Sequence, residues 1–129
     1  MAEEYSITQL SKEFDVTTRA IRFYEDKGLL KPRREGQTRV YSAKDRVFLK
    51  LILRGKRIGF SLKESQEIIE LYDPQSGNTH QLKIMLGKIN EKRMQLEQQI
   101  HDIELMQVEL GDAERRCQQA LDESLQTKD

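Results

Sequence analysis

The last third of the chain constrains the fold most. No proline occurs after Pro74, and from Leu82 onward apolar residues recur at alternating steps of four and three. This spacing is typical of a coiled-coil helix. At 1.5 Å per residue the helix would be about 60 Å long, and alone it would leave its apolar stripe in water. Because the rest of the chain has no second helix of this length, we expect two copies to pair.

The stripe predicts the residues of a dimer interface. These are Leu82, Leu86, Ile89, Leu96, Ile100, Ile103, Leu110, Cys117 and Leu121. Arg93, Gln107 and Glu114 interrupt the stripe, and polar residues at such positions fix register and orientation at some expense of stability. Cys117 is interpreted as a small apolar side chain of the stripe.

Two short helices and a basic hairpin are predicted within roughly the first forty residues. Ser6 with Gln9 fits a capping box, Thr17 suits the N-cap of the next helix, and Gly28 suits its left-handed C-terminal cap. A helix-turn-helix followed by such a hairpin, or wing, places one helix in a DNA groove while the wing grips the backbone. The candidate DNA-contacting residues are Thr17, Thr18, Arg19, Arg22, Phe23, Tyr24, Arg33, Arg34, Arg39 and Tyr41.

The alternative interpretations are simpler. Arg19 and Arg22 could form a solvated basic face, and a hairpin turning near Gly36 could be basic by chance. Beside a helix pair, however, its cations favour phosphate contact, because neutralised phosphates release counterions. Tyr24 and Tyr41 each have two interpretations. In one, the ring packs in the core and the hydroxyl reaches a phosphate; in the other, the side chain only packs.

Charge is distributed unevenly although the net charge is zero. Residues 1–60 carry fourteen Lys and Arg against eight Asp and Glu, and residues 61–129 carry eight against fourteen. A net charge of +6 in the first part indicates a polyanionic partner for that part alone. One cysteine rules out an intramolecular disulfide, and the acidic start lacks an apolar signal core. We expect a cytoplasmic, nucleoid-associated protein.

The predicted fold class is mainly α, a winged helix-turn-helix domain followed by a long C-terminal coiled-coil helix. A third helix over about 43–58 is expected to bury Phe48, Leu51 and Ile52. A fourth, over about 62–72, is expected to offer its apolar residues to the core, namely Leu62, Ile68, Ile69 and Leu71. The predicted divisions are a DNA-binding domain over 1–73, a hinge loop over 74–78, a dimerisation helix over 79–125 and a tail over 126–129.

The sequence contains few features that indicate a catalytic site or a metal site. No nucleophile–base pair, glycine-rich phosphate loop or paired acids occur, so an enzyme is not expected. Cys117, His80 and His101 lie far apart, whereas zinc and copper sites need clustered ligands. No metal or cofactor is therefore expected. Two alternatives remain open: a metal or thiol sensor using Cys117 across a dimer, and a coiled-coil interaction protein.

Four motifs resemble those of the MerR family of bacterial transcription regulators. They lie at residues 17–25, 28–30, 39–42 and 58–62. The resemblance implies a dimer joined by an antiparallel coiled coil, which bends and untwists promoters with an overlong spacer for RNA polymerase. It places Thr17, Thr18, Arg19, Arg22 and Tyr24 on the recognition helix, and Arg39 and Tyr41 at wing positions that touch the backbone or minor groove. Phe23 stands where many relatives carry tyrosine.

Departures from the family narrow the resemblance. Metal-sensing members carry cysteines around the loop and the end of the long helix, and residues 73–80 have none. Redox members carry a cysteine cluster, and multidrug members append a large ligand domain. Residues 51–60 and 71–78 resemble the subgroup that regulates leucine and isovalerate catabolism. That resemblance implies a small-molecule effector of the acyl-CoA type, which we expect to act near the loop over 73–80. The sequence leaves open the operator, the regulated genes, and activation versus repression.

Overall fold

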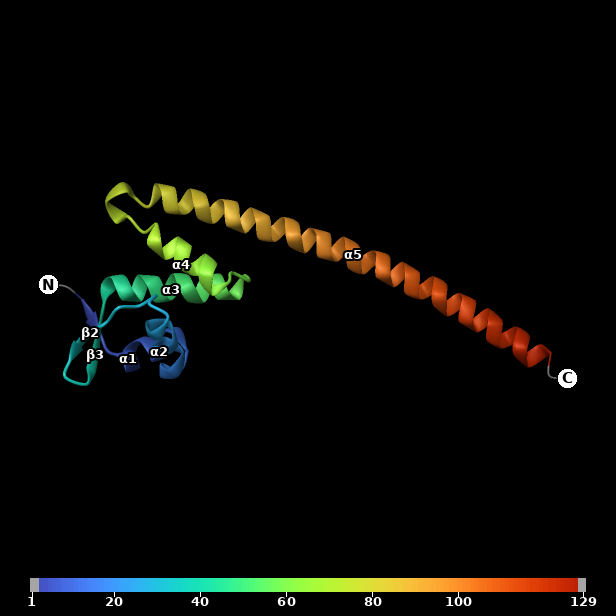
Figure 1. The fold of residues 1–129 in the computed structure, drawn as a ribbon, viewed down its shortest axis with the longest axis horizontal. Coiled ribbons are helices and arrows are strands. Elements are labelled where there is room, and N and C mark those ends of the chain that lie inside the picture. The colour runs from blue at the N-terminus through green and yellow to red at the C-terminus, as the bar shows by residue number, and fades with distance from the viewer. Residues whose placement is uncertain (1–2, 128–129) are drawn as a thin grey trace. The chain divides into compact units, whose positions relative to one another are not determined.

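The computed structural model describes residues 3–127. It divides into two compact units, Met1–Met85 and Leu86–Asp129, which are described separately below. Both are mainly helical, as predicted (Figure 1). The elements in chain order are β1 (Glu4–Tyr5), α1 (Ile7–Phe14), α2 (Thr18–Asp26), β2 (Arg33–Glu35), β3 (Thr38–Ser42), α3 (Ala43–Arg57), α4 (Leu62–Glu70), the 3-10 turn η1 (Pro74–Ser76) and α5 (Thr79–Gln126).

Local hydrogen bonds set the starts of the helices in the first unit. Capping boxes begin α1, α3 and α4 at Ser6, Ser42 and Ser61, and the first of them confirms the box predicted at Ser6 and Gln9. Asp45, inside the second of these boxes, also accepts a hydrogen bond from the Lys31 backbone N–H at 3.1 Å. The chain leaving α2 is thereby tied to the first turn of α3.

The sheet has three strands where the sequence predicts two. β3 lies in the middle, pairing antiparallel with β2 and with the two-residue strand β1. β1 is too short to show a periodic pattern, so the sequence gives no signal for it. The predicted hairpin turn is present at Gly36, whose φ of +63° is a left-handed conformation that glycine adopts without strain.

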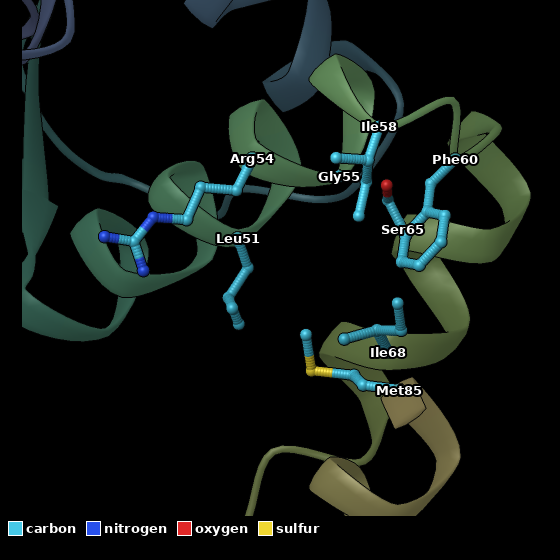
Figure 2. Close-up of a pocket in the computed structure, with 8 residues that line it drawn as sticks. All are labelled: Leu51, Arg54, Gly55, Ile58, Phe60, Ser65, Ile68 and Met85. Atoms are coloured by element: carbon cyan, nitrogen blue, oxygen red, sulfur yellow. The ribbon is translucent and has the colours of Figure 1, made fainter. Parts of the chain in front are cut away.

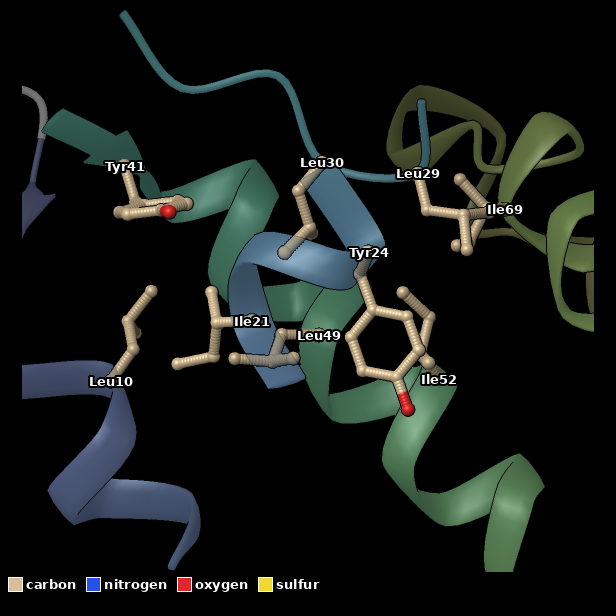
Figure 3. Packing of buried hydrophobic residues seen from close by; sticks show 9 residues of the cluster. All are labelled: Leu10, Ile21, Tyr24, Leu29, Leu30, Tyr41, Leu49, Ile52 and Ile69. Atoms are coloured by element: carbon tan, nitrogen blue, oxygen red, sulfur yellow. The ribbon is translucent and has the colours of Figure 1, made fainter. Parts of the chain in front are cut away.

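The core joins α1, α2, β3, α3 and α4 (Figure 3). In Figures 1 and 3, α3 lies between α2 on one side and α4 on the other. The buried apolar residues of this cluster are Leu10, Ile21, Tyr24, Leu29, Leu30, Tyr41, Leu49, Ile52 and Ile69.

The phase of α3 differs from the predicted one. Leu49 and Ile52 are buried, whereas Phe48 and Leu51 are only half-buried. The buried face of α3 starts at Asp45 and continues through Leu49 and Ile52, spacings of four and three that bring one side of a helix to the core. In α4 the prediction holds for Ile68 and Ile69, while Leu62 and Leu71 are half-buried.

Helices α3 and α4 approach closely at Gly55. A β-carbon there would lie 3.1 Å from the Phe60 ring and 3.3 Å from Ser65 Oγ. Beside this contact is an apolar cavity of about 100 Å³, which Met85 of α5 also lines (Figure 2). Ligand pockets usually enclose roughly 300–1,000 Å³, so this cavity is a packing feature.

The loop between α4 and α5 is closed by its own hydrogen bonds. The Asp73 N–H donates to Asn78 Oδ1 at 2.7 Å, and the Asn78 N–H donates to the Asp73 carbonyl at 3.0 Å. The buried Gln81 side chain donates to the Ile68 carbonyl at 2.8 Å, which fixes the first turn of α5 to α4. The predicted hinge is thus a folded turn.

The second unit consists of α5 from Leu86 onward. The predicted long helix is present and ends at Gln126, inside the predicted tail, whose residues 128–129 lie outside the described part. Over residues 3–127, none of the helices combines the length and the apolarity that crossing a membrane requires.

Tyr41 has a buried hydroxyl without a hydrogen-bond partner in the described part of the chain. Removing it by Tyr41→Phe should raise the free energy of unfolding by about 1 kcal/mol, because an unsatisfied buried donor is lost. Burial raises the pKa of Tyr41 to about 12 from 10.0. The unfolded chain therefore loses the Tyr41 proton at lower pH than the folded one, so the wild-type protein loses stability as pH rises from 10 toward 12. Phenylalanine does not titrate, so the advantage of Tyr41→Phe is constant below pH 10 and increases above it. Urea unfolding at neutral and alkaline pH tests this, and a less stable Tyr41→Phe at pH 7 would contradict it.

Candidate nucleic-acid interface

Helix α2 presents one polar face to solvent. Ile21 and Tyr24 are buried, whereas Arg19, Arg22 and Phe23 on the opposite side are exposed. The helix begins where Thr17 Oγ1 accepts a hydrogen bond from the Ala20 N–H at 3.0 Å. Because the buried face fixes the rotation of the helix about its axis, the arginines are available to a partner.

The two tyrosines belong to the core. Tyr24 is nearly buried and Tyr41 is completely buried. The structure therefore supports the interpretation in which Tyr41 simply packs. Burial rather than hydrogen bonding explains its position, since its hydroxyl finds no acceptor among the described residues.

Phe23 is the exposed aromatic residue of α2. Its side chain is 47% exposed, and the Lys27 ammonium lies 5.5 Å from its ring centroid. The ring meets Tyr24 edge-on at 5.6 Å between centroids. An apolar ring on the solvent face that also exposes Arg19 and Arg22 suits contact with a base.

The hairpin separates its three arginines between two faces. Arg34 pairs directly with Arg39 across the strands, on the same face as Tyr41, while Arg33 pairs with Val40 on the other face. Arg33 donates to Glu4 at 3.1 Å and to Glu35 at 2.5 Å, in ion pairs that are half exposed. The alternation of side chains between the two faces of a strand is the sequence signal for this division of the arginines.

Glu25 of α2 joins the hairpin to the recognition helix. Its Oε1 accepts from Arg34 Nη2 at 3.0 Å, and its Oε2 accepts from Arg39 Nε at 2.6 Å. The Glu25 hydrogen bond raises the pKa of Arg39, which therefore remains charged. Nothing in the sequence pattern singles out Glu25, because its partners are set by the tertiary fold.

A basic hollow of about 460 Å³ lies between the α1–α2 turn and the end of α3. Asp15 and Val16 line it from the turn. Four cationic residues line it from α3, namely Lys50, Arg54, Lys56 and Arg57. The fold thus brings these cations of α3 beside the turn of the helix pair.

Arg46 has a structural role on the same helix. It forms an ion pair with Glu13 of α1, with Nε donating to Oε1 at 3.0 Å, and its guanidinium lies 5.9 Å from the Tyr5 ring centroid. The hydrogen bond from Arg46 lowers the pKa of Glu13. Arg46 therefore holds α1 against α3, and its charge is already neutralised.

Metal-ligating side chains are scattered over the residues that the structure describes. Between residues 3 and 127, no group of three or more His, Cys, Asp and Glu side chains is placed to hold an ion. Cys117 is a free, exposed thiol on α5.

Comparisons with known proteins agree with this geometry. Residues 5–71 match the profile of the MerR HTH family regulatory proteins, and residues 46–113 match the MerR DNA-binding profile. The transcriptional regulator CueR of Escherichia coli strain CFT073 is 34% identical over 81% of this chain and 77% of its own length.

Solved structures show the same fold. A MerR-family transcriptional regulator from Bacillus cereus superposes with a TM-score of 0.61 at 30% identity, covering 78% of this chain and 72% of that chain. HiNmlR, a MerR family regulator lacking the sensor domain and bound to promoter DNA, gives a TM-score of 0.56 at 22% identity, covering 79% and 76%. The present chain therefore belongs to the MerR family of DNA-binding transcription regulators, and it is not an enzyme.

Proposed function

We propose that two copies of this chain pair through α5 and together bind and distort one promoter duplex. Each copy presents the exposed face of α2 to a major groove and the hairpin to the neighbouring backbone. The observation that carries the proposal is the outward placement of Arg19 and Arg22 by a helix whose opposite face is locked in the core. HiNmlR, which shares the fold, was solved on promoter DNA.

Phosphate contacts are assigned to cations around α2. Arg34 and Arg39 lie beside α2, where both bind its residue Glu25. Lys56 and Arg57 lie beside the α1–α2 turn. Cations placed along a DNA backbone add affinity by releasing counterions but do not read sequence. In this proposal, α2 supplies the sequence discrimination and the flanking cations supply most of the affinity.

Pairing through α5 is supported by its exposed apolar stripe. The seven residues of the stripe that are each 51–66% exposed are Leu82, Leu86, Leu96, Ile100, Ile103, Leu110 and Leu121. Cys117 is also exposed, and Ile89 is half-buried. Apolar side chains at heptad spacing are stabilised by a facing helix. MerR regulators typically bind promoters as homodimers, and two-fold symmetry would present two α2 helices to one operator.

The most specific part of the proposal is the regulated pathway. The similarity of residues 51–60 and 71–78 to the leucine and isovalerate subgroup supports a role in branched-chain amino acid and acyl-CoA catabolism. Recruitment of RNA polymerase and an acyl-CoA effector belong to the same proposal. Footprinting of bound promoters followed by a screen of short branched acyl-CoA thioesters tests it. Unchanged regulation in Cys117→Ser would remove the alternative of a thiol or metal sensor.

The target duplex is selected from a random pool with the wild-type protein. Arg22→Ala should reduce the discrimination between this target duplex and a scrambled version of it. A lost arginine–base contact costs about 1–3 kcal/mol, which is roughly 5-fold to 150-fold in the affinity for the target alone. Fluorescence anisotropy measures both dissociation constants. Arg116→Ala, at an exposed position of α5, serves as the control. Equal affinity ratios in Arg22→Ala and wild type would remove α2 as the reading element.

Lys56→Gln combined with Arg57→Gln should weaken binding to target and scrambled duplexes alike. Two lost phosphate contacts reduce the slope of log affinity against log salt by about 2. A salt titration with both duplexes measures this slope. An unchanged slope would show that the basic hollow lies away from DNA.

Ile103→Asp should convert the dimer to monomers, raising the dimer dissociation constant by about 100-fold or more, because a charge would be buried in the seam. Leu105→Asp is the matched control. Leu105 is 50% exposed and Ile103 55% exposed, but two residues along a helix place them on opposite sides. Sedimentation equilibrium measures both variants. Equal dissociation constants for the two would contradict pairing through this stripe.

A further inference from the structure

We infer that Glu25 is a positioning residue that sets the hairpin against α2 and thereby raises the preference for target over non-target DNA. The inference rests on the DNA-binding surface proposed above. It concerns a carboxylate at a surface that otherwise attracts phosphates, where a negative charge opposes binding unless it has another role.

The register of the sheet creates a need for this carboxylate. Arg34 and Arg39 are direct cross-strand partners in the β2–β3 hairpin and point to the same face of it. Like charges at directly opposed positions destabilise an antiparallel pair. Without a counter-charge, the two guanidinium groups would splay the side chains or the strands apart.

Glu25 supplies the counter-charge by dividing its oxygens between the two arginines. Oε1 binds Arg34 at 3.0 Å and Oε2 binds Arg39 at 2.6 Å. The Glu25 side chain is 14% exposed, against 62% for Glu35 in its pair with Arg33. Exposed pairs contribute little and are screened by salt, whereas partly buried pairs are screened less. The Glu25 pairs are therefore the ones that constrain the hairpin.

The atoms involved leave the arginines able to bind DNA. Glu25 engages Arg39 through Nε, so both Nη amino groups of that residue remain uncommitted to this carboxylate. It engages Arg34 through Nη2 alone. A guanidinium has five N–H donors in a fixed fork, so an anchored arginine still has donors for a phosphate while its position is fixed.

The anchor lies on the helix that carries the base-reading side chains. Glu25 is three residues from Arg22, one turn further along α2. The distance between the base-contacting side chains of α2 and the phosphate-binding arginines of the hairpin is thus fixed before the protein binds DNA. Pre-ordering of this kind favours a duplex that matches both sets of contacts at once.

Electrostatics and positioning predict opposite effects of removing this carboxylate. If Glu25 acts only as a negative charge, Glu25→Gln strengthens binding to every duplex. If it positions the hairpin, Glu25→Gln weakens binding to the target and leaves or increases binding to a scrambled duplex. Glu35→Gln is the matched control, since it also removes one negative charge that is paired with a hairpin arginine, but from β2 and without a contact to α2.

The experiment measures dissociation constants of Glu25→Gln, Glu25→Asp and Glu35→Gln for the selected target duplex and its scrambled version at one salt concentration. We expect the target preference to fall about tenfold in Glu25→Gln, equivalent to the loss of about one hydrogen-bonded contact to a charged group. Glu25→Asp keeps the charge but shortens the side chain, so the preference should fall there too. Glu35→Gln should keep the wild-type preference.

Hydrogen exchange of the free protein provides a readout independent of DNA. Amides of β2 and β3 should exchange faster in Glu25→Gln and Glu25→Asp, while the amides of α3 keep their wild-type rates. Faster exchange throughout, with both duplexes weakened in parallel, would overturn the inference by showing a general loss of stability. Equal strengthening of both duplexes in Glu25→Gln and Glu35→Gln would overturn it as well. A wild-type protein that does not distinguish the duplexes would instead defeat the proposed function, and the exchange data would still decide the positioning role.

Discussion

The burial of one side of α2 is the constraint on which the DNA-binding surface depends. A nine-residue helix is too short to be stable alone in water, so it exists because Ile21 and Tyr24 pack in the core with Leu49 and Ile52 of α3 (Figure 3). That packing leaves Arg19 and Arg22 no position except the outer face. The same core contacts that fold the domain therefore also aim its cations.

Ion pairs inside the protein then divide the basic residues by role. Arg46 is paired with Glu13 and holds two helices together. Arg34 and Arg39 share Glu25, so they are held in place and still keep donors for a phosphate. A count of positive charges treats all of these residues alike. Their partners show that only some are available to add counterion release on binding DNA.

Local chemistry explains how much of this was predictable. Capping boxes and glycine turns act within a few residues, so the sequence predicts the starts of α1, α2, α3 and α4 and the position of the hairpin. Strand β1, the burial of Leu49 in place of Phe48, and the ion pairs of Glu25 depend on contacts between distant segments. Of the candidate site, Arg19, Arg22 and Phe23 are exposed as expected, whereas Tyr41 is enclosed by the core.

The most direct test of the account is a crystal structure of the protein on its selected duplex. The account predicts two protomers related by a two-fold axis, with Arg22 of each in a major groove. It also predicts Arg34 and Arg39 on adjacent phosphates while Glu25 still bridges them. A complex in which α2 faces solvent, or in which one protomer alone occupies the duplex, would contradict it.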